Sequence, residues 1–207
     1  MAAKTKSAAD MDDVQSQLRL FLEELGYRWR ARTCNRKTND GLTHVLNFQL
    51  GQRSLQGKFT LNVGVYVPEA ASAQYGSAEP SFVQEPSCCI RRRLGELGPE
   101  QRDLWWKLPL RWFEIPGLKR RLKRDALPFL ARFETRDSIL QELTPLKGNT
   151  GGGMPNRIVC AILLAHRGES EAARAMLAAQ IHETANPGHA DYIQKLSERL
   201  GLGRIER

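Results

Sequence analysis

The change of apolar periodicity at Gly26 constrains the fold of this 207-residue chain more than any other feature of its sequence. Before Gly26, apolar residues recur every three or four positions over residues 11–25, which is the spacing of an amphipathic helix. After it, residues 27–33 alternate aromatic or small residues with arginines, which is the period-two pattern of a strand. A helix followed by antiparallel strands indicates an α+β fold.

The rest of the first half continues the strand pattern. Further strands are expected at residues 45–50, 59–67, 88–94 and 110–115. A surface loop is expected over residues 68–86, because this stretch is rich in Ala, Ser, Gly and Pro. The fold class is therefore α+β, with an N-terminal helix, an antiparallel sheet of four to five strands, and a C-terminal helical subdomain.

Composition along the chain predicts four parts. Residues 1–9 are expected to form a disordered tail and residues 10–146 an α+β domain. Residues 147–155 contain four glycines and are expected to be a linker. Residues 156–207 are expected to form a helical subdomain, which consists of a tetratricopeptide-like hairpin plus one helix.

Positive charge is concentrated in one stretch. The whole chain has a formal charge of +8, and residues 91–124 carry 11 basic and 4 acidic residues, a difference of +7. A localised basic face favours an anionic partner, whereas a solvated helix face plus an exposed strand is the alternative interpretation. The candidate partner-binding residues are Arg91, Arg92, Arg93, Arg111, Lys119, Arg120, Arg121, Lys123 and Arg124.

Two functions could use this basic patch. The first is non-enzymatic binding of a protein partner with an acidic surface. The alternative is nucleic-acid binding, because Trp105, Trp106 and Trp112 interleave with the arginines and aromatic rings can stack on bases. Neither a nucleic-acid reader motif nor a membrane-spanning stretch is present in the sequence.

The expected middle strands carry a polar set. Asn47 and Gln49 share one face of their strand, and Asn62 and Tyr66 share one face of the next. These residues either form a hydrogen-bonded network that braces the sheet or line a polar ligand surface. The second alternative for function is therefore an enzyme of unknown reaction with a pocket on this sheet face.

No motif in the sequence declares a reaction, a metal or a cofactor. The glycine run at 148–153 lacks the Gly-Lys-Ser/Thr ending of a phosphate-binding loop, and the four histidines are scattered. The four cysteines form no Cys-x-x-Cys pair, and each is expected to be a buried thiol. With no apolar signal-peptide core, the expected location is the cytoplasm.

Four segments carry a resemblance to a known family. They are His-Val-Leu-Asn-Phe-Gln at 44–49, Phe-Thr-Leu-Asn-Val-Gly-Val-Tyr at 59–66, Cys-Cys-Ile-Arg-Arg-Arg-Leu at 88–94, and Asp-Leu-Trp-Trp at 103–106. In order and spacing they resemble the bacterial family "domain of unknown function 4304", over about residues 12–143. This family has no established activity to carry over. Small α+β families of this kind occur near bacterial toxin and defence loci, so the resemblance suggests a toxin-neutralising (immunity) or defence-associated factor by analogy only.

Overall fold

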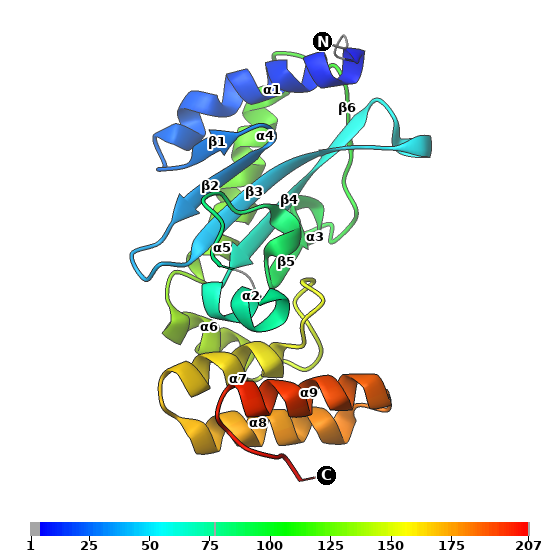
Figure 1. Ribbon diagram of the computed structural model, residues 1–207. Coiled ribbons are helices and arrows are strands. Elements are labelled where there is room, and N and C mark those ends of the chain that lie inside the picture. The colour runs from blue at the N-terminus through cyan, green and yellow to red at the C-terminus, as the bar shows by residue number, and fades with distance from the viewer. Residues whose placement is uncertain (1–4, 77, 207) are drawn as a thin grey trace.

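An antiparallel sheet between helices organises the chain in the computed structural model, which describes residues 5–76 and 78–206 (Figure 1). This arrangement confirms the expected α+β class. The helices are α1 (Lys6–Glu23), α2 (Pro68–Tyr75), α3 (Leu94–Leu97), α4 (Ile115–Arg121), α5 (Leu127–Ala131), α6 (Arg136–Leu143), α7 (Asn156–His166), α8 (Ser170–Glu183) and α9 (Pro187–Arg199). The strands are β1 (Arg28–Arg30), β2 (Thr33–Lys37), β3 (Thr43–Leu50), β4 (Lys58–Tyr66), β5 (Ile90–Arg93) and β6 (Trp106–Lys107), and the short helical turns are η1 (Arg53–Leu55), η2 (Glu85–Ser87) and η3 (Leu122–Ala126).

The N-terminal helix starts earlier than its apolar stripe. Thr5 caps α1 by accepting a hydrogen bond from the backbone N–H of Ala8, at 3.3 Å. The expected disordered tail is therefore wrong for residues 6–9, which are helical, and residues 1–4 lie outside the described residues. The helix buries its apolar stripe and ends at Gly26, whose φ of +85° places it in the left-handed region that glycine favours.

Within the described residues, the sheet runs in the order β1-β2-β3-β4-β5, with β6 pairing beside β4, so it has six strands where four to five are expected. The alternating run at 27–33 is two strands, because a two-residue turn at Ala31 and Arg32 folds it back on itself. The strand expected at 110–115 is wrong. That segment leads into α4, where Pro116 occupies the first helical turn that proline favours.

The expected loop at 68–86 contains a helix. Pro68 stands in the first turn of α2, and Gly76 ends it with a φ of +64°. This helix and the segment after it cover one half of a sheet face. Beneath them lies a small buried cluster of Val45, Tyr66, Ala71, Val83 and Cys88.

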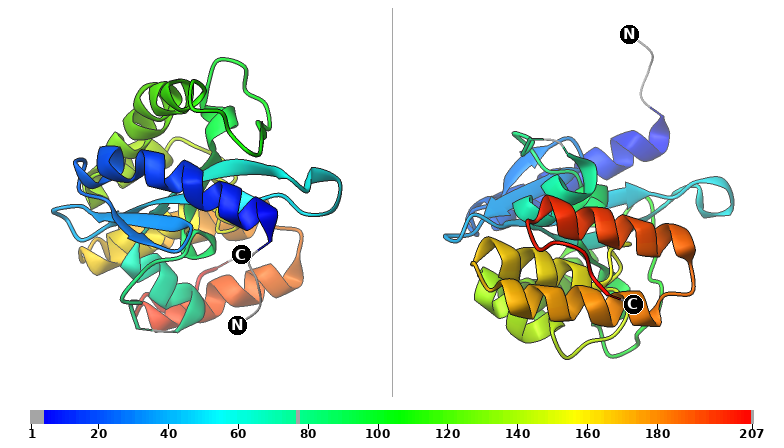
Figure 2. Two further views of the ribbon diagram at one scale, coloured as in Figure 1. Left: turned by 90° about the horizontal axis from the view of Figure 1, so that it is seen from above. Right: turned by 60° about the horizontal axis from the view of Figure 1, so that its bottom comes forward.

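The opposite face of the sheet supports the main core, on which α1, α4 and α5 pack (Figure 1). The buried apolar side chains of α7, α8 and α9 belong to the same continuous cluster, and α7 packs against α2 and α6. Figure 2 shows these three C-terminal helices stacked side by side. All four cysteines are buried and free.

The glycine-rich segment is not a free linker. Gly151 pairs with Ile90, and the N–H of Arg91 donates to the carbonyl of Thr150 at 2.6 Å. The segment packs on β5 because its glycines have no Cβ to hold the two backbones apart. Among the described residues, no helix has both the length and the apolar character needed to cross a membrane.

Candidate functional site

A polar row crosses the sheet from β2 to β5. Thr33, Asn47, Asn62 and Arg93 stand directly opposite one another on four successive strands. The Asn47 amide donates to the Thr33 hydroxyl at 2.9 Å, and the Asn62 amide donates to Gln49 Oε1 at 2.8 Å. These side chains share the sheet face that α2 leaves half uncovered, so the predicted polar face exists.

Arginines of β5 border this row, and each is held by a different partner. The guanidinium of Arg91 donates from Nε and Nη2 to the two carboxylate oxygens of buried Glu85, at 2.6 and 3.1 Å. Arg93 pairs with Asp103 at 2.5 Å and lies over the ring of Trp105. The buried carboxylate of Glu85 is thus compensated by the guanidinium of Arg91, as charge burial requires.

The polar residues and the arginines surround one pocket, here called the arginine pocket, of about 360 Å³. Gly151 and Asn149 of the glycine-rich segment form part of its wall. Its lining residues are Gln49, Asn62, Glu85, Arg91, Arg92, Arg93, Glu96, Asn149 and Gly151.

Tyr66 does not join this pocket. It shares the face of Asn62 on β4 but is only 2% exposed, beneath α2 and the segment that follows it. Burial raises the pKa of its hydroxyl, and neighbouring acids including Glu79 raise it further. The expected polar set is therefore split, with three members around the sheet row and Tyr66 in the small apolar cluster.

The basic stretch is also split, because nearby acids pair with part of it. Arg121 makes two hydrogen bonds to Glu100, at 2.9 and 3.2 Å, and these hold the pKa of that carboxyl below its usual value. Arg124 makes two to Asp125, at 2.6 and 2.7 Å. The positive charges of Arg121 and Arg124 are thus each compensated by a carboxylate of the same chain.

The remaining cations adjoin exposed aromatic side chains at the start of α4. Trp112 is 80% exposed and Phe113 is 54% exposed, and their rings meet edge-to-face at 5.9 Å. Figure 2 shows α4 beside α1. We call this the aromatic–basic surface, and its residues are Phe21, Arg111, Trp112, Phe113, Lys119, Arg120 and Lys123.

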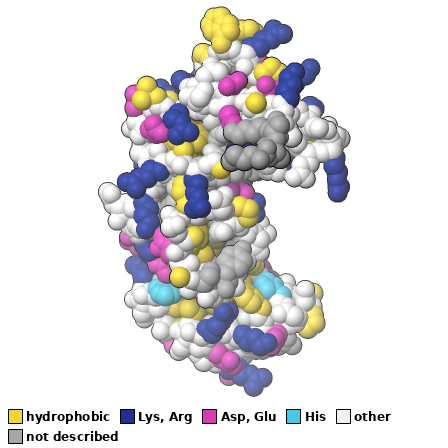
Figure 3. Space-filling view, turned by 45° about the horizontal axis from the view of Figure 1, so that its top comes forward, with side chains coloured by type: hydrophobic (Ala, Val, Ile, Leu, Met, Phe, Trp, Pro, Cys, Tyr) yellow, Lys and Arg dark blue, Asp and Glu magenta, His cyan; other side chains and the backbone are white. Residues whose placement is uncertain are grey.

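Cation–π contacts tie this surface together. Arg111 lies 5.7 Å from the ring centre of Phe113, and Lys119 and Lys123 lie 5.9 and 5.3 Å from that of Phe21 on α1. Such contacts are favourable because the negatively polarised face of an aromatic ring attracts a cation. In the space-filling view, a hydrophobic side chain projects at the upper end of the molecule beside Lys and Arg side chains (Figure 3).

The aromatic residues expected to contact a partner were only partly identified from the sequence. Trp105 is half-buried under Arg93, and Trp106 is half-buried and stacks on Phe59 at 5.4 Å. Of the exposed pair, Trp112 belongs to the expected interleaving of arginines and tryptophans, whereas Phe113 was not singled out.

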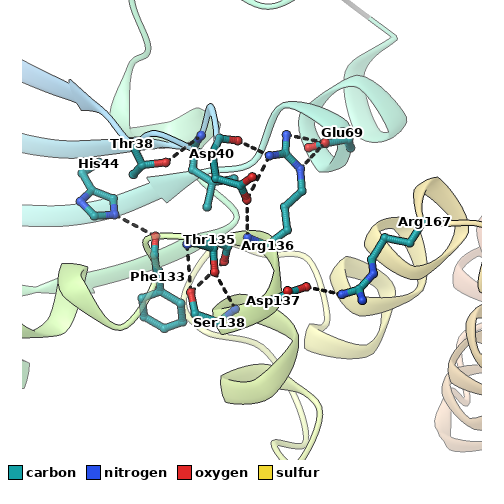
Figure 4. Close-up of polar contacts among 11 residues, drawn as sticks. Thr38, Asp40, His44, Glu69, Phe133, Thr135, Arg136, Asp137, Ser138 and Arg167 are labelled. Atoms are coloured by element: carbon teal, nitrogen blue, oxygen red, sulfur yellow. Dashed lines mark hydrogen bonds and ion pairs between the residues drawn. The ribbon is translucent and has the colours of Figure 1, made fainter.

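A separate buried cluster surrounds His44, as Figure 4 shows for its contact with Phe133. His44 Nε2 donates to the carbonyl of Phe133 at 2.9 Å, and Nδ1 accepts from Arg36 at 2.9 Å. Arg36 pairs in turn with Glu134. Burial lowers the pKa of His44, and the Phe133 carbonyl and Glu134 oppose this shift only in part.

The folding free energy is therefore expected to depend on the protonation of His44. Because its folded pKa is lowered, stability is greatest above the unfolded value of about 6.5 and falls as the pH drops below it. Urea unfolding at a series of pH values should show this loss in the wild-type chain and a flatter profile in His44→Gln. A constant stability difference between the two chains from about pH 7.5 to about pH 5 would contradict the assignment.

Arg136 joins three segments at the other end of the sheet (Figure 4). Its backbone N–H donates to Asp40 Oδ2 at 2.6 Å, and its Nε donates to Glu69 Oε1 at 2.6 Å. Arg136, at the start of α6, is thus hydrogen-bonded to both the turn after β2 and the first turn of α2. This cluster is a structural joint, since its acids and its base are paired with each other.

The arrangement around the arginine pocket suits binding better than proton transfer. Its two carboxylates are hydrogen-bonded, Glu85 to Arg91 and Glu96 to the backbone N–H of Arg93 at 3.1 Å. In the described part of the chain, no group of three or more His, Cys, Asp and Glu residues could hold a metal ion.

Comparison with known proteins supplies a match to a family model. No curated protein and no solved structure matches the chain. The expected resemblance is confirmed by a family model that covers β1 to β5 and the start of the aromatic–basic surface. Residues 18–112 of this chain match the family described as "Domain of unknown function (DUF4304)".

Proposed function

We propose that this protein is a non-enzymatic interaction module that binds an acidic surface of a partner protein through its aromatic–basic surface. The observation that carries the proposal is the exposure of Trp112, at 80%, with Phe113 beside it. Tryptophan and arginine dominate the energetically important positions of protein interfaces. Trp112 contacts the ring of Phe113 at its edge but stays largely exposed, so a partner that covers it would bury most of its apolar surface.

Charge supports an acidic partner. Arg111, Lys119, Arg120 and Lys123 form no ion pair within residues 5–76 and 78–206. Three of these cations lie within two turns of helix from one another on α4 and η3, and Arg111 lies just before α4. Complementary charge on the partner would steer association and set orientation.

Nucleic-acid binding is the second candidate function, and the same tryptophan favours it. An exposed ring beside cations can stack on an unpaired base while the cations contact phosphates. The two candidates differ in their dependence on salt, because release of counterions from a nucleic acid gives a steep log–log slope.

Fluorescence anisotropy with two labelled probes separates the candidates. The first probe is an amphipathic peptide rich in Glu and Leu, and the second is a single-stranded DNA of similar charge. We expect the peptide to bind the wild-type chain. We expect Trp112→Ala to weaken this binding about thirtyfold, since a central aromatic contact is worth roughly 2 kcal/mol.

Charge reversal at Lys119, Arg120 and Lys123 to Glu should abolish peptide binding while sparing the fold. The matched control reverses Arg28, Arg30 and Arg53, three exposed arginines at other places on the surface, and should retain binding. Tighter binding of the DNA with a steep salt dependence would favour the second candidate. Peptide binding that survives the reversal on α4 and η3 would refute the role of this surface.

A further inference from the structure

We infer that the arginine pocket is a binding site for a small molecule that carries an oxyanion, a phosphate or a carboxylate, next to a second oxygen acceptor. The pocket belongs to the sheet and does not include the aromatic–basic surface. The inference therefore stands independently of the proposed function. It rests on which groups face the pocket and on how they are held.

Three sequence features that are far apart meet at this pocket. Arg91, Arg92 and Arg93 come from β5, Gln49 and Asn62 come from β3 and β4, and the wall at Asn149 and Gly151 comes from the glycine-rich segment. The wall can form because glycines permit close approach. A Cβ on Gly151 would lie 2.2 Å from the carbonyl oxygen of Arg91.

Arg92 is the cation that remains available for a ligand. Arg91 is bound to Glu85 and Arg93 to Asp103, but within the described ranges no carboxylate pairs with Arg92. Arg92 stands opposite Val63, so its side chain starts from the other face of β5. Its guanidinium nevertheless lies beside Gly151 in the pocket wall, where Nη1 donates to the carbonyl oxygen of Arg91 at 2.9 Å. A guanidinium held in place with remaining N–H donors matches the geometry of carboxylate and phosphate groups.

Gln49 supplies the second donor. Its Oε1 accepts from Asn62 at 2.8 Å, so its exposed amide NH₂ is directed away from that bond and can donate to a ligand oxygen. Both groups offered to the pocket are thus hydrogen-bond donors, which selects a ligand rich in acceptor oxygens.

Charge and size narrow the ligand class further. Three arginines and two glutamates line the pocket, a difference of +1, so an anion is favoured over a cation. A volume of about 360 Å³ lies at the lower end of the range for ligand pockets, which fits a small metabolite rather than a large cofactor.

The test is a titration followed by ¹⁵N NMR at constant pH and ionic strength, with inorganic phosphate and acetate as separate probes. We expect saturable shifts of the Gln49 side-chain amide and the Arg92 Nε–H signals for at least one probe. The probe that binds more tightly identifies the oxyanion. Arg92→Gln should weaken this binding at least about tenfold, since it removes a charge-assisted contact.

The control is Arg111→Gln, which removes the same charge outside the pocket and should leave the affinity unchanged. Gln49→Ala is a second variant that keeps all three arginines, and it should weaken binding less than Arg92→Gln. The inference is overturned if neither probe gives saturable shifts at the pocket. It is equally overturned if the folded Arg92→Gln variant binds as tightly as the wild-type chain.

Discussion

Replacing Arg136 by alanine should lower the free energy of unfolding by about 3 kcal/mol, because it leaves two partly buried carboxylates without their cation. Asp40 and Glu69 both pair with Arg136, and the Glu69 side chain is only 16% exposed. A second oxygen of Glu69 is buried with no hydrogen-bond partner, so this carboxylate depends on Arg136 for its compensation. Urea unfolding at neutral pH measures the effect.

Arg132→Ala is the matched control. Arg132 pairs with Glu142 on the surface, with a side chain that is 54% exposed, so the expected loss is about 0–1 kcal/mol. A loss for Arg136→Ala no greater than for Arg132→Ala would show that the joint contributes no more than a surface ion pair. The double variant Arg136→Leu with Glu69→Leu should recover part of the loss, because both charges are then removed together.

This joint could not be predicted from the sequence. Arg136 lies 96 positions from Asp40 and 67 from Glu69, and nothing local to any of them indicates the others. Their pairing depends on how the turn after β2, α2 and α6 pack together. The residues of α2 were expected to form a loop, so one of the three elements was missing from the expected fold.

The missed helix shows why composition failed there. The α2 sequence Pro-Glu-Ala-Ala-Ser-Ala-Gln-Tyr has no strong apolar stripe, and its small residues also suit a loop. What favours the helix is Pro68 in its first turn, Gly76 at its end, and the burial of Ala70 and Ala71. Pro68 and Gly76 can be identified from the local sequence, whereas the burial of the two alanines depends on the folded structure.

Strand alternation, by contrast, predicted the polar face well. The spacing of Asn47 and Gln49, two residues apart, places them on one side of β3 whatever the strand pairs with. The register that sets Asn47 opposite Asn62 is a property of the folded hairpin. The faces were therefore predictable, whereas the neighbours across the strands were not.

The basic stretch illustrates a different limit. Counting charges over residues 91–124 leaves out Glu85 and Asp125, which lie just outside it and pair with Arg91 and Arg124. The chain is locally basic, but part of that charge is compensated within the fold. Exposure of Trp112 could not be predicted either, because a tryptophan in an apolar run is more often buried.

Gly152→Ala should lower the free energy of unfolding by about 3 kcal/mol or more, because the new methyl group has no space. A Cβ at this position would lie 2.0 Å from the carbonyl oxygen of Cys89 and 2.7 Å from its Cα. Both atoms belong to the backbone just before β5, so no side chain can rotate to make room. Relief requires the glycine-rich segment to move off the chain at Cys89 and β5, which would also open the wall of the arginine pocket.

Gly148→Ala separates this steric effect from backbone conformation in the same segment. Gly148 has a φ of +76° but nothing within 4 Å of its Cβ position. Alanine at this position should therefore cost only the backbone strain of a left-handed conformation, about 1 kcal/mol. Gly152 carries no such positive φ, and its cost is entirely one of space. Thermal and urea unfolding should therefore show a much lower stability for Gly152→Ala than for Gly148→Ala. A greater loss of stability for Gly148→Ala would mean that the glycine-rich segment moves away from β5 at little cost and is not a rigid wall of the arginine pocket.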